Sequence, residues 1–266
     1  MRLDLLITVR GLVKSREIAK AAISNNRVFV NGKCISKPSA EVSDNAEIEI
    51  RGEIQKFVSR GGNKLERALD YFDIDVKEKI CLDLGASTGG FTDCLLQHGA
   101  KLVFAVDVGH DQLDKSLRGD SRVVSIEGVN AREINRGLIG VVPDLATVDL
   151  SFISLALILP ALREVLPDNG EAVCLIKPQF EAGKGNVGKK GIVRDEKTHI
   201  RVMEEFIQNA HVNGFAVRGI MLSPISGGDG NIEFLAHLAG DGGKQINVRD
   251  TVKAARNDAN EKDEQA

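Results

Sequence analysis

The sequence lacks the features that would place the chain in a membrane or around a structural metal ion. None of its apolar runs approaches the ~18 residues of a spanning helix, and its start has no signal-peptide core. The four cysteines, Cys34, Cys81, Cys94 and Cys174, are scattered, with no Cys-x-x-Cys pair to hold zinc. Three of them fall in apolar stretches. We therefore expect a cytoplasmic protein with buried thiols and no bound metal.

A general excess of positive charge is also missing, since the net charge is −3. This average hides an asymmetry, because residues 1–37 contain eight basic and only two acidic side chains. Some of the acidic side chains that offset this positive charge lie in residues 257–266, a polar tail that we expect to be disordered. There is no internal repeat and no low-complexity linker. A length of 266 residues with 42% hydrophobic residues allows one catalytic domain plus a small module.

The most informative stretch is residues 80–90, which reads Ile-Cys-Leu-Asp-Leu-Gly-Ala-Ser-Thr-Gly-Gly. A short apolar run typical of a buried strand breaks into small residues just before the helical pattern of residues 91–98. Gly85, Gly89 and Gly90 allow positive φ and a close approach to a ligand, and the start of a helix offers unpaired N–H groups. The stretch predicts a strand, a tight loop and a helix around a nucleotide-like group.

Two carboxylates narrow the kind of ligand. Asp83 would repel bound phosphates but could pair with a cationic amino-acid group, and Asp107 ends the next predicted strand about 20 residues after the loop, where it can bind ribose hydroxyls. A ligand with an adenosine ribose and an ammonium, but no phosphate, fits both features, and S-adenosylmethionine is such a ligand. A dinucleotide site remains the alternative. The other candidate ligand contacts are Gly85, Ala86, Ser87, Gly89, Gly90, Phe91 and Asn130, of which Asn130 could equally be a simple loop residue.

Further apolar segments predict an α/β domain. Strands are expected at 102–106, 123–126, 145–148, 171–176, 216–223 and 234–238, and helices at 65–72, 154–165 and 196–210. Four polar residues on separate elements are expected to converge at one edge of the sheet: Lys64, Asp149, Lys177 and Glu233. Pro178 forces Lys177 into an extended conformation at the end of its strand. Asp149 could instead cap the following helix, although Ser154 can do that, and Lys64 could be a solvated surface lysine.

The N-terminal pattern is that of a small separate module. Residues 5–9 and 18–23 have helical spacing, with Ser15 as a cap, and residues 27–33 read as a strand entering the turn at Asn31-Gly32. This order resembles the S4-type RNA-binding module. A basic face would bind phosphates, although charge runs are often only solvated surface. The candidate RNA contacts are Arg2, Arg10, Lys14, Arg16, Lys20, Arg27 and Lys33.

The four polar residues and their flanking segments closely resemble the TlyA family of ribose 2′-O-methyltransferases, an FtsJ-like group sometimes labelled hemolysins. The segments are Leu-Asp-Leu-Gly-Ala-Ser-Thr-Gly-Gly-Phe-Thr, Val-Asp-Leu-Ser-Phe-Ile-Ser, Leu-Ile-Lys-Pro-Gln-Phe-Glu and Gly-Asn-Ile-Glu-Phe-Leu. The resemblance implies a Rossmann-like sheet of seven strands, the last antiparallel, with helices on both faces, after a small α+β RNA-binding domain. It also implies S-adenosylmethionine as methyl donor and cytidine 2′-hydroxyls of ribosomal RNA as acceptors. We expect domains at 1–58 and 59–242 and a variable tail at 243–266.

Our chemical hypothesis makes Lys177 the general base, Asp149 an orienting group, and Glu233 the partner of Lys64 or of the hydroxyl. Phe180 could stack on a displaced base but could equally be a core residue. The alternative function is that of an RNA-binding, ribosome-associated factor without methylation. Base methylation fits less well, because Asp149-Leu150-Ser151-Phe152 replaces the Asn-Pro-Pro-Tyr or cysteine common in such enzymes. A pore-forming toxin is disfavoured, since no segment is long and apolar enough to span a membrane.

Overall fold

The structure is a computed structural model that describes residues 1–13, 16–24, 26–52, 56–188, 191–227 and 230–264. The chain forms two compact units, Met1–Arg60 and Gly61–Ala266. Each unit has its own hydrophobic core.

The N-terminal unit packs two helices on a small antiparallel sheet with the order β2-β1-β3. Its elements are α1 (Leu3–Val9), α2 (Arg16–Ser24), β1 (Val28–Val30), β2 (Lys33–Cys34) and β3 (Ile48–Ile50). Asn31 and Gly32 both have positive φ, at 48° and 78°, so the predicted tight turn between β1 and β2 is confirmed. The predicted cap Ser15 lies outside the described residues.

The larger unit is built on a seven-stranded sheet with the order β6-β5-β4-β7-β8-β10-β9. β10 runs antiparallel to both of its neighbours, β8 and β9, whereas β4 to β8 pair in parallel, which confirms the predicted sheet. The strands are β4 (Ile80–Leu84), β5 (Leu102–Asp107), β6 (Val123–Glu127), β7 (Leu145–Val148), β8 (Glu171–Ile176), β9 (Ala216–Leu222) and β10 (Phe234–Ala239). The central strands β7 and β10 are buried along their whole length, which explains their continuous apolar runs.

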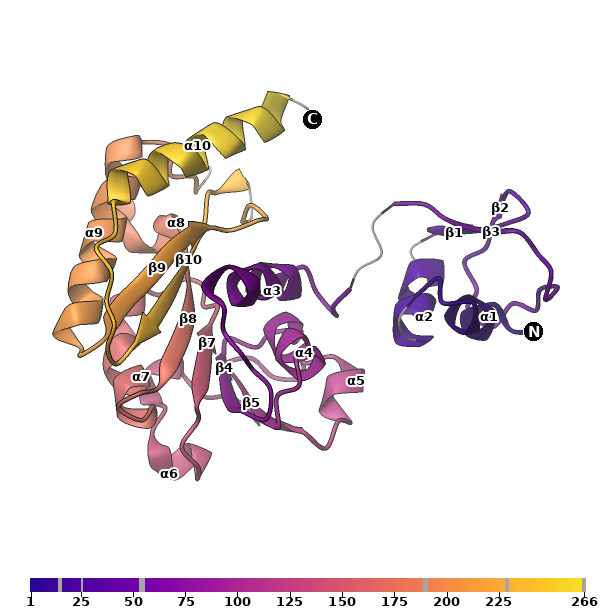
Figure 1. Cartoon of the computed structure of the whole chain (residues 1–266), viewed down its shortest axis with the longest axis horizontal. Helices are drawn as coiled ribbons and strands as arrows, with labels where there is room; N and C mark the ends of the chain where they lie inside the picture. Colours follow the sequence, from indigo (N-terminus) through magenta and orange to yellow (C-terminus); the bar gives the residue numbers. More distant parts are fainter. Residues whose placement is uncertain (14–15, 25, 53–55, 189–190, 228–229, 265–266) are drawn as a thin grey trace. The chain divides into compact units, whose positions relative to one another are not determined.

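Helices cover both faces of this sheet (Figure 1). Helices α3 and α4 pack on one face, and α7 and α9 enclose the main core on the other. The helices of this unit up to α9 are α3 (Gly61–Phe72), α4 (Gly90–Gln97), α5 (Lys115–Arg118), α6 (Arg136–Ile139), α7 (Leu159–Val165), α8 (Pro178–Glu181) and α9 (Glu196–Val212), with 3₁₀ turns η1 (Ala131–Glu133), η2 (Leu155–Leu157) and η3 (Lys184–Asn186). The parallel strands β4, β5, β7 and β8 end at the same edge of the sheet, where a doubly wound fold places its ligands.

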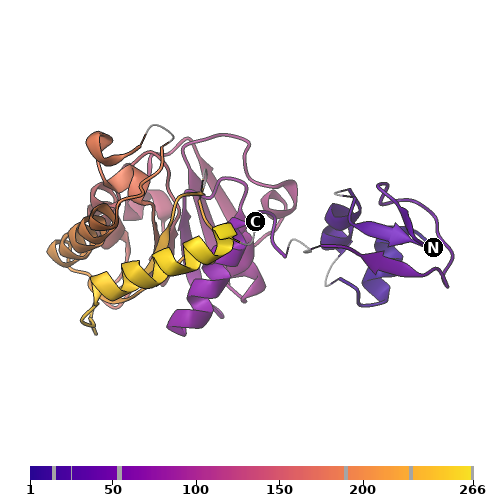
Figure 2. The ribbon, with the colours of Figure 1, turned by 90° about the horizontal axis from the view of Figure 1, so that it is seen from above.

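The C-terminal segment differs from the disordered tail that its composition predicts. It forms the helix α10 (Val248–Glu264), which packs against α9 and β9 (Figure 2). Val248, Val252 and Ala255 recur at helical spacing and are buried in the main core. These three residues precede the polar stretch 257–266, so the composition of that stretch does not reveal that a helix anchored by them continues to Glu264.

Candidate active site

The loop after β4 is shaped by two glycines whose conformations other residues rarely adopt. Gly85 has φ of +85°, and a Cβ there would lie 2.3 Å from the carbonyl oxygen of Asp149. Gly89 has φ of +96° and precedes α4, and a Cβ there would overlap the side chains of Leu113 and Leu117. The loop therefore packs directly against the backbone that follows β7.

Asp83 is bound by two threonines, and its predicted pairing with a cationic group stays a prediction. Its carboxylate is fully buried and accepts hydrogen bonds from the hydroxyls of Thr92 at 2.7 Å and Thr147 at 2.9 Å. Burial raises the pKa of Asp83 to about 6, although both threonine hydrogen bonds act in the opposite direction. Asp83 ties β4 to β7 and to the start of α4.

A cleft of about 650 Å³ opens beside the loop, a volume suited to a small-molecule ligand. Five of the predicted site residues line it: Gly85, Ser87, Asp107, Asn130 and Asp149. Ala86 lines a smaller cavity next to it, whereas Gly90 and Phe91 are buried in the first turn of α4 and Gly89 shapes the loop before it. Sequence reasoning missed Gln112 and Arg132, which also line the cleft.

Asp107 lies where a ribose could be bound. Its Oδ2 accepts the backbone N–H of Ser87 and its Oδ1 that of Gly109, both at 2.7 Å. Each carboxylate oxygen can accept a further hydrogen bond, so two acceptors remain for a pair of hydroxyls. Asn130 caps η1 through the backbone N–H of Arg132 at 3.1 Å, so part of its role is structural. An adenosine ribose and its attached groups therefore fit these residues.

The four polar residues that the sequence singled out form two ion pairs at the same edge of the sheet. Lys64 Nζ lies 2.6 Å from Glu233 Oε2, and Lys177 Nζ lies 2.6 Å from Asp149 Oδ1. The side chains of Lys64 and Glu233 are only 11% and 3% exposed, and those of Lys177 and Asp149 are 12% and 23% exposed.

Strand register brings the two ion pairs together. In the ladder between β8 and β10, Ile176 is opposite Phe234. The next positions outward are Lys177 and Glu233, and the backbones of directly opposite residues lie about 5 Å apart. Four groups from α3 and from the ends of three strands therefore converge beside the cleft.

The structure decides between the two roles considered for Asp149. The turn η2 is capped by Ser154, whose Oγ accepts the N–H of Ala156 at 3.2 Å, and by Glu181, which accepts the N–H of Leu155 at 2.8 Å. Burial raises the pKa of Glu181. Asp149 is therefore not needed as a cap and is available to Lys177.

Two further residues at this edge escaped sequence reasoning. Lys177 Nζ donates a hydrogen bond to Ser151 Oγ at 3.0 Å. Phe152 is 90% exposed at the cleft and has φ of +64°, unusual for a large residue, and its ring lies 4.9 Å from the half-buried ring of Phe180. Ser151 and Phe152 lie within the segment Val-Asp-Leu-Ser-Phe-Ile-Ser, which resembles the TlyA family. Only the fold shows that the side chain of Phe152 is exposed to solvent.

The predicted RNA-binding residues of the N-terminal unit fall into two groups. Arg2 and Arg16 each contact Asp4 at 3.0 Å and, against the effect of burial, lower its pKa to about 2. Arg10 donates to the backbone carbonyls of Ala46 and Asp44. These three guanidinium groups therefore have structural partners.

The remaining basic residues are differently placed. The side chains of Lys20, Arg27 and Lys33 form no hydrogen bond or ion pair within the described ranges, and Lys20 and Lys33 are exposed. Lys14 lies outside the described residues. Arg51, which sequence reasoning missed, stacks over the ring of Phe29 at 3.9 Å. Among the predicted RNA contacts that the structure describes, the cations without a side-chain partner are therefore Lys20, Arg27 and Lys33.

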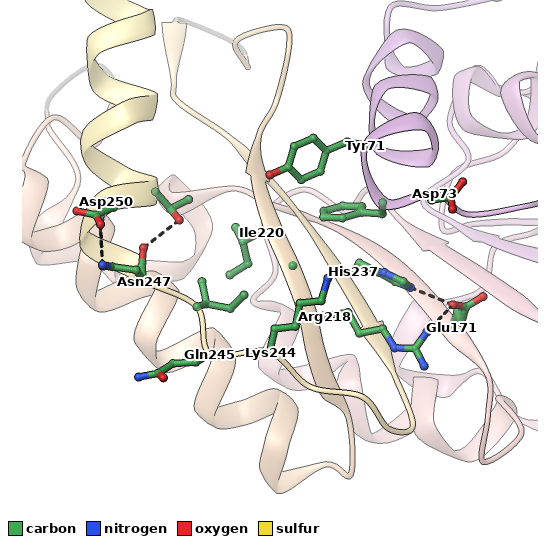
Figure 3. Close-up of a pocket in the computed structure, with 14 residues that line it drawn as sticks. Tyr71, Asp73, Glu171, Arg218, Ile220, His237, Lys244, Gln245, Asn247 and Asp250 are labelled. Carbon is green, nitrogen blue, oxygen red and sulfur yellow. Dashed lines mark hydrogen bonds and ion pairs between the residues drawn. The ribbon is translucent and has the colours of Figure 1, made fainter.

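A second cleft, of about 700 Å³, lies elsewhere on the larger unit between α3, β9 and the start of α10 (Figure 3). Glu171 in its wall is bound by His237 at 3.2 Å, and by Arg218 and Lys79 at 3.1 Å each. The hydrogen bond from His237 and the charge of Lys79 outweigh burial and lower the pKa of Glu171 to about 2. Glu171 begins β8, about 20 Å along the strand from Lys177. Because its ionic groups mainly satisfy one another, we do not assign the chemistry to this larger cleft.

The described part of the chain shows no cluster of side chains suited to a metal ion. Among the same residues, no helix has the length and apolar character needed to cross a bilayer.

A seven-stranded sheet with an antiparallel β10, and a cleft for adenosine beside a glycine loop, define an S-adenosylmethionine-dependent methyltransferase. The sequence model of FtsJ-like methyltransferases matches residues 57–239, and that of the S4 domain matches residues 1–48. The chain therefore belongs to the FtsJ-like methyltransferase family, and it carries an N-terminal S4 domain.

Individual relatives agree with this assignment. The chain is 49% identical over 242 residues to a Bacillus subtilis protein named "Putative rRNA methyltransferase YqxC", with 89% of this chain and 85% of that one covered. It is 43% identical over 238 residues to the "16S/23S rRNA (cytidine-2'-O)-methyltransferase TlyA" of Mycobacterium tuberculosis, with 89% of each covered. A solved structure described as a "Putative hemolysin from Streptococcus thermophilus" is 45% identical, with a TM-score of 0.77 and coverage of 100% of this chain and 98% of that one.

Proposed function

We propose that the protein transfers a methyl group from S-adenosylmethionine to the 2′-hydroxyl of a cytidine in ribosomal RNA, in the cytoplasm. The observation that carries this proposal is the pair of buried ion pairs, Lys64–Glu233 and Lys177–Asp149, at the edge of the cleft. A domain that only bound RNA would gain nothing from two largely desolvated lysines at the edge of its sheet. The name of the Mycobacterium tuberculosis relative supports the choice of cytidine and of ribosomal RNA.

Bound S-adenosylmethionine supplies a methyl group on a positively charged sulfur. Asp107, the backbone around Gly85 and Ser87, and Asn130 would hold its adenosine part in the cleft. The fixed backbone of this loop restricts how the donor can lie and excludes part of the surrounding water. These residues bind and orient, and none of them needs to exchange a proton.

Lys177 performs the acid–base step. As a free amine it accepts the proton of the ribose hydroxyl, so that the O–H bond breaks and an N–H bond forms. The oxygen would gain the methyl group as the methyl–sulfur bond breaks, and the electron pair of that bond would remain on the sulfur as a neutral thioether. The ammonium that results is stabilised by Asp149 at 2.6 Å and returns its proton to solvent after the reaction. Lys64 and Glu233, next to Lys177 across the strand ladder, hold the hydroxyl and keep the local charge balanced.

The N-terminal unit would bring the RNA to this edge. Lys20, Arg27 and Lys33 are the predicted RNA contacts whose side chains have no partner within the described residues, so they are free to contact phosphates. The exposed ring of Phe152 provides a surface on which an unstacked base could rest beside the reacting ribose.

The proposal is tested by incubating the purified full-length chain with ribosomal subunits and S-adenosylmethionine, followed by nucleoside mass spectrometry. We expect 2′-O-methylcytidine to appear. A methyl group on the base, or RNA binding without any methyl transfer, would contradict the proposal. The second outcome would favour the RNA-binding factor.

A further inference from the structure

The turn after β7 places a hydroxyl group against the amine of Lys177. Ser151 Oγ accepts a hydrogen bond from Lys177 Nζ at 3.0 Å. Asp149 Oδ1 is closer, at 2.6 Å, yet within the described residues this oxygen accepts no hydrogen bond of good geometry. The contact with Asp149 is therefore an ion pair without a directional bond. Asp149 therefore balances the charge of Lys177, whereas Ser151 fixes the direction of one of its N–H bonds.

The segment that carries Ser151 is fixed on both sides. Before it, the N–H of Asp149 donates to the carbonyl of Leu84 at 2.9 Å, and the absence of a side chain at Gly85 lets the two loops touch. After it, Phe152 adopts a left-handed conformation that costs energy for a large residue. Ser154 then begins the capped turn η2. Because so few residues lie between these fixed points, the backbone of Ser151 has little freedom to move, and the side-chain conformation seen here keeps its hydroxyl beside the amine.

The chemistry of a neutral amine makes this hydrogen bond consequential. Such an amine has two N–H bonds and one lone pair, arranged tetrahedrally with the Cε–Nζ bond, and it otherwise rotates freely. One N–H held by Ser151 stops this rotation, and the negative charge of Asp149 attracts the second N–H and repels the lone pair. We propose that Ser151 is a positioning residue that turns the lone pair of Lys177 toward the hydroxyl to be methylated. This inference rests on the proposed function of Lys177 as the base.

The test compares three variants of the full-length chain. Ser151→Ala removes the hydroxyl and Ser151→Thr keeps it, while Ser121→Ala is the matched control at an exposed serine that lines neither cleft. The measured quantities are the single-turnover rate of methyl transfer at saturating RNA and donor, the KM for RNA, and the calorimetric Kd for S-adenosylhomocysteine.

We expect Ser151→Ala to lower the single-turnover rate about tenfold, the effect of losing one hydrogen bond, with KM and Kd changed by less than about twofold. Ser151→Thr should recover most of the rate, and Ser121→Ala should match the wild type. A rate within about twofold of wild type in Ser151→Ala would overturn the inference. So would an equal loss in the threonine variant, or a loss accompanied by weaker donor binding, because the serine would then have only a packing role. If the wild type itself transfers no methyl group, the proposed function and this inference fall together.

Discussion

The buried carboxylate of Asp83 should leave a measurable signature in the pH dependence of stability. Its pKa is about 6 in the folded protein, against 3.8 for an ordinary aspartate. The folded state therefore holds the proton more tightly than the unfolded chain does. The stability that this proton provides is fully present below pH 3.8 and is lost as the pH rises toward 6. A shift of about two units corresponds to a change of about 3 kcal/mol in the free energy of unfolding.

Replacing Asp83 with asparagine preserves the shape of the side chain and removes the titration. The asparagine can still pair with the hydroxyls of Thr92 and Thr147, which donate and accept. We expect the stability of Asp83→Asn relative to wild type to rise by about 2 kcal/mol between pH 4 and pH 7, because a small part of the effect already occurs below pH 4.

The assay is urea unfolding of both full-length proteins at a series of pH values, followed by circular dichroism. Taking the difference between them cancels the titration of other groups, such as Glu171. Asp75→Asn, at an exposed turn, is the control for the substitution itself. A constant difference for Asp83→Asn over the same range would refute the reasoning, since it would mean that burial does not hold a proton on Asp83.

Two further predictions concern binding. Asp107→Ala should raise the Kd for S-adenosylhomocysteine by about 10- to 100-fold, because charge-assisted hydrogen bonds to the ribose are lost, while RNA affinity stays the same; an unchanged Kd in calorimetry would remove Asp107 from the ribose site. Replacing Lys20, Arg27 and Lys33 together with alanine should reduce the slope of log affinity against log salt for RNA by about two, since each phosphate contact on a single strand contributes about 0.7. Filter binding at several salt concentrations measures this slope, and the wild-type slope in the triple variant would show that RNA binds elsewhere.

Much of the fold could be predicted because local patterns carry it. The apolar runs of β4, β5, β7 and β8 are long enough to identify buried strands, and the loop after β4 needs glycine at position 85 for a reason visible in the structure, the contact with Asp149. The sequence also predicted that four polar residues meet at one edge of the sheet: Lys64, Asp149, Lys177 and Glu233. Three of them flank strands, and strand ends meet at such an edge.

The parts that could not be predicted depend on contacts between distant residues. β4 is covered on both faces, so its sequence does not reveal that Asp83 accepts hydrogen bonds from two threonines. Counting charges in residues 1–37 does not reveal that Arg2 and Arg16 are both paired with Asp4. The direction of Ser151 toward Lys177 depends on the backbone conformation of one turn, which residue types alone do not determine.

The central claim is that Lys177 removes the proton from the acceptor hydroxyl. The most direct test is the single-turnover rate of 2′-O-methyl formation on ribosomal RNA by wild type, Lys177→Ala and Lys177→Arg. Arginine keeps the positive charge beside Asp149 but cannot act as a base at neutral pH. The account predicts that both variants lose at least about 100-fold in rate, while the Kd for S-adenosylhomocysteine changes by less than about twofold. A rate close to wild type in Lys177→Arg would contradict it, because a positive charge alone would then be enough.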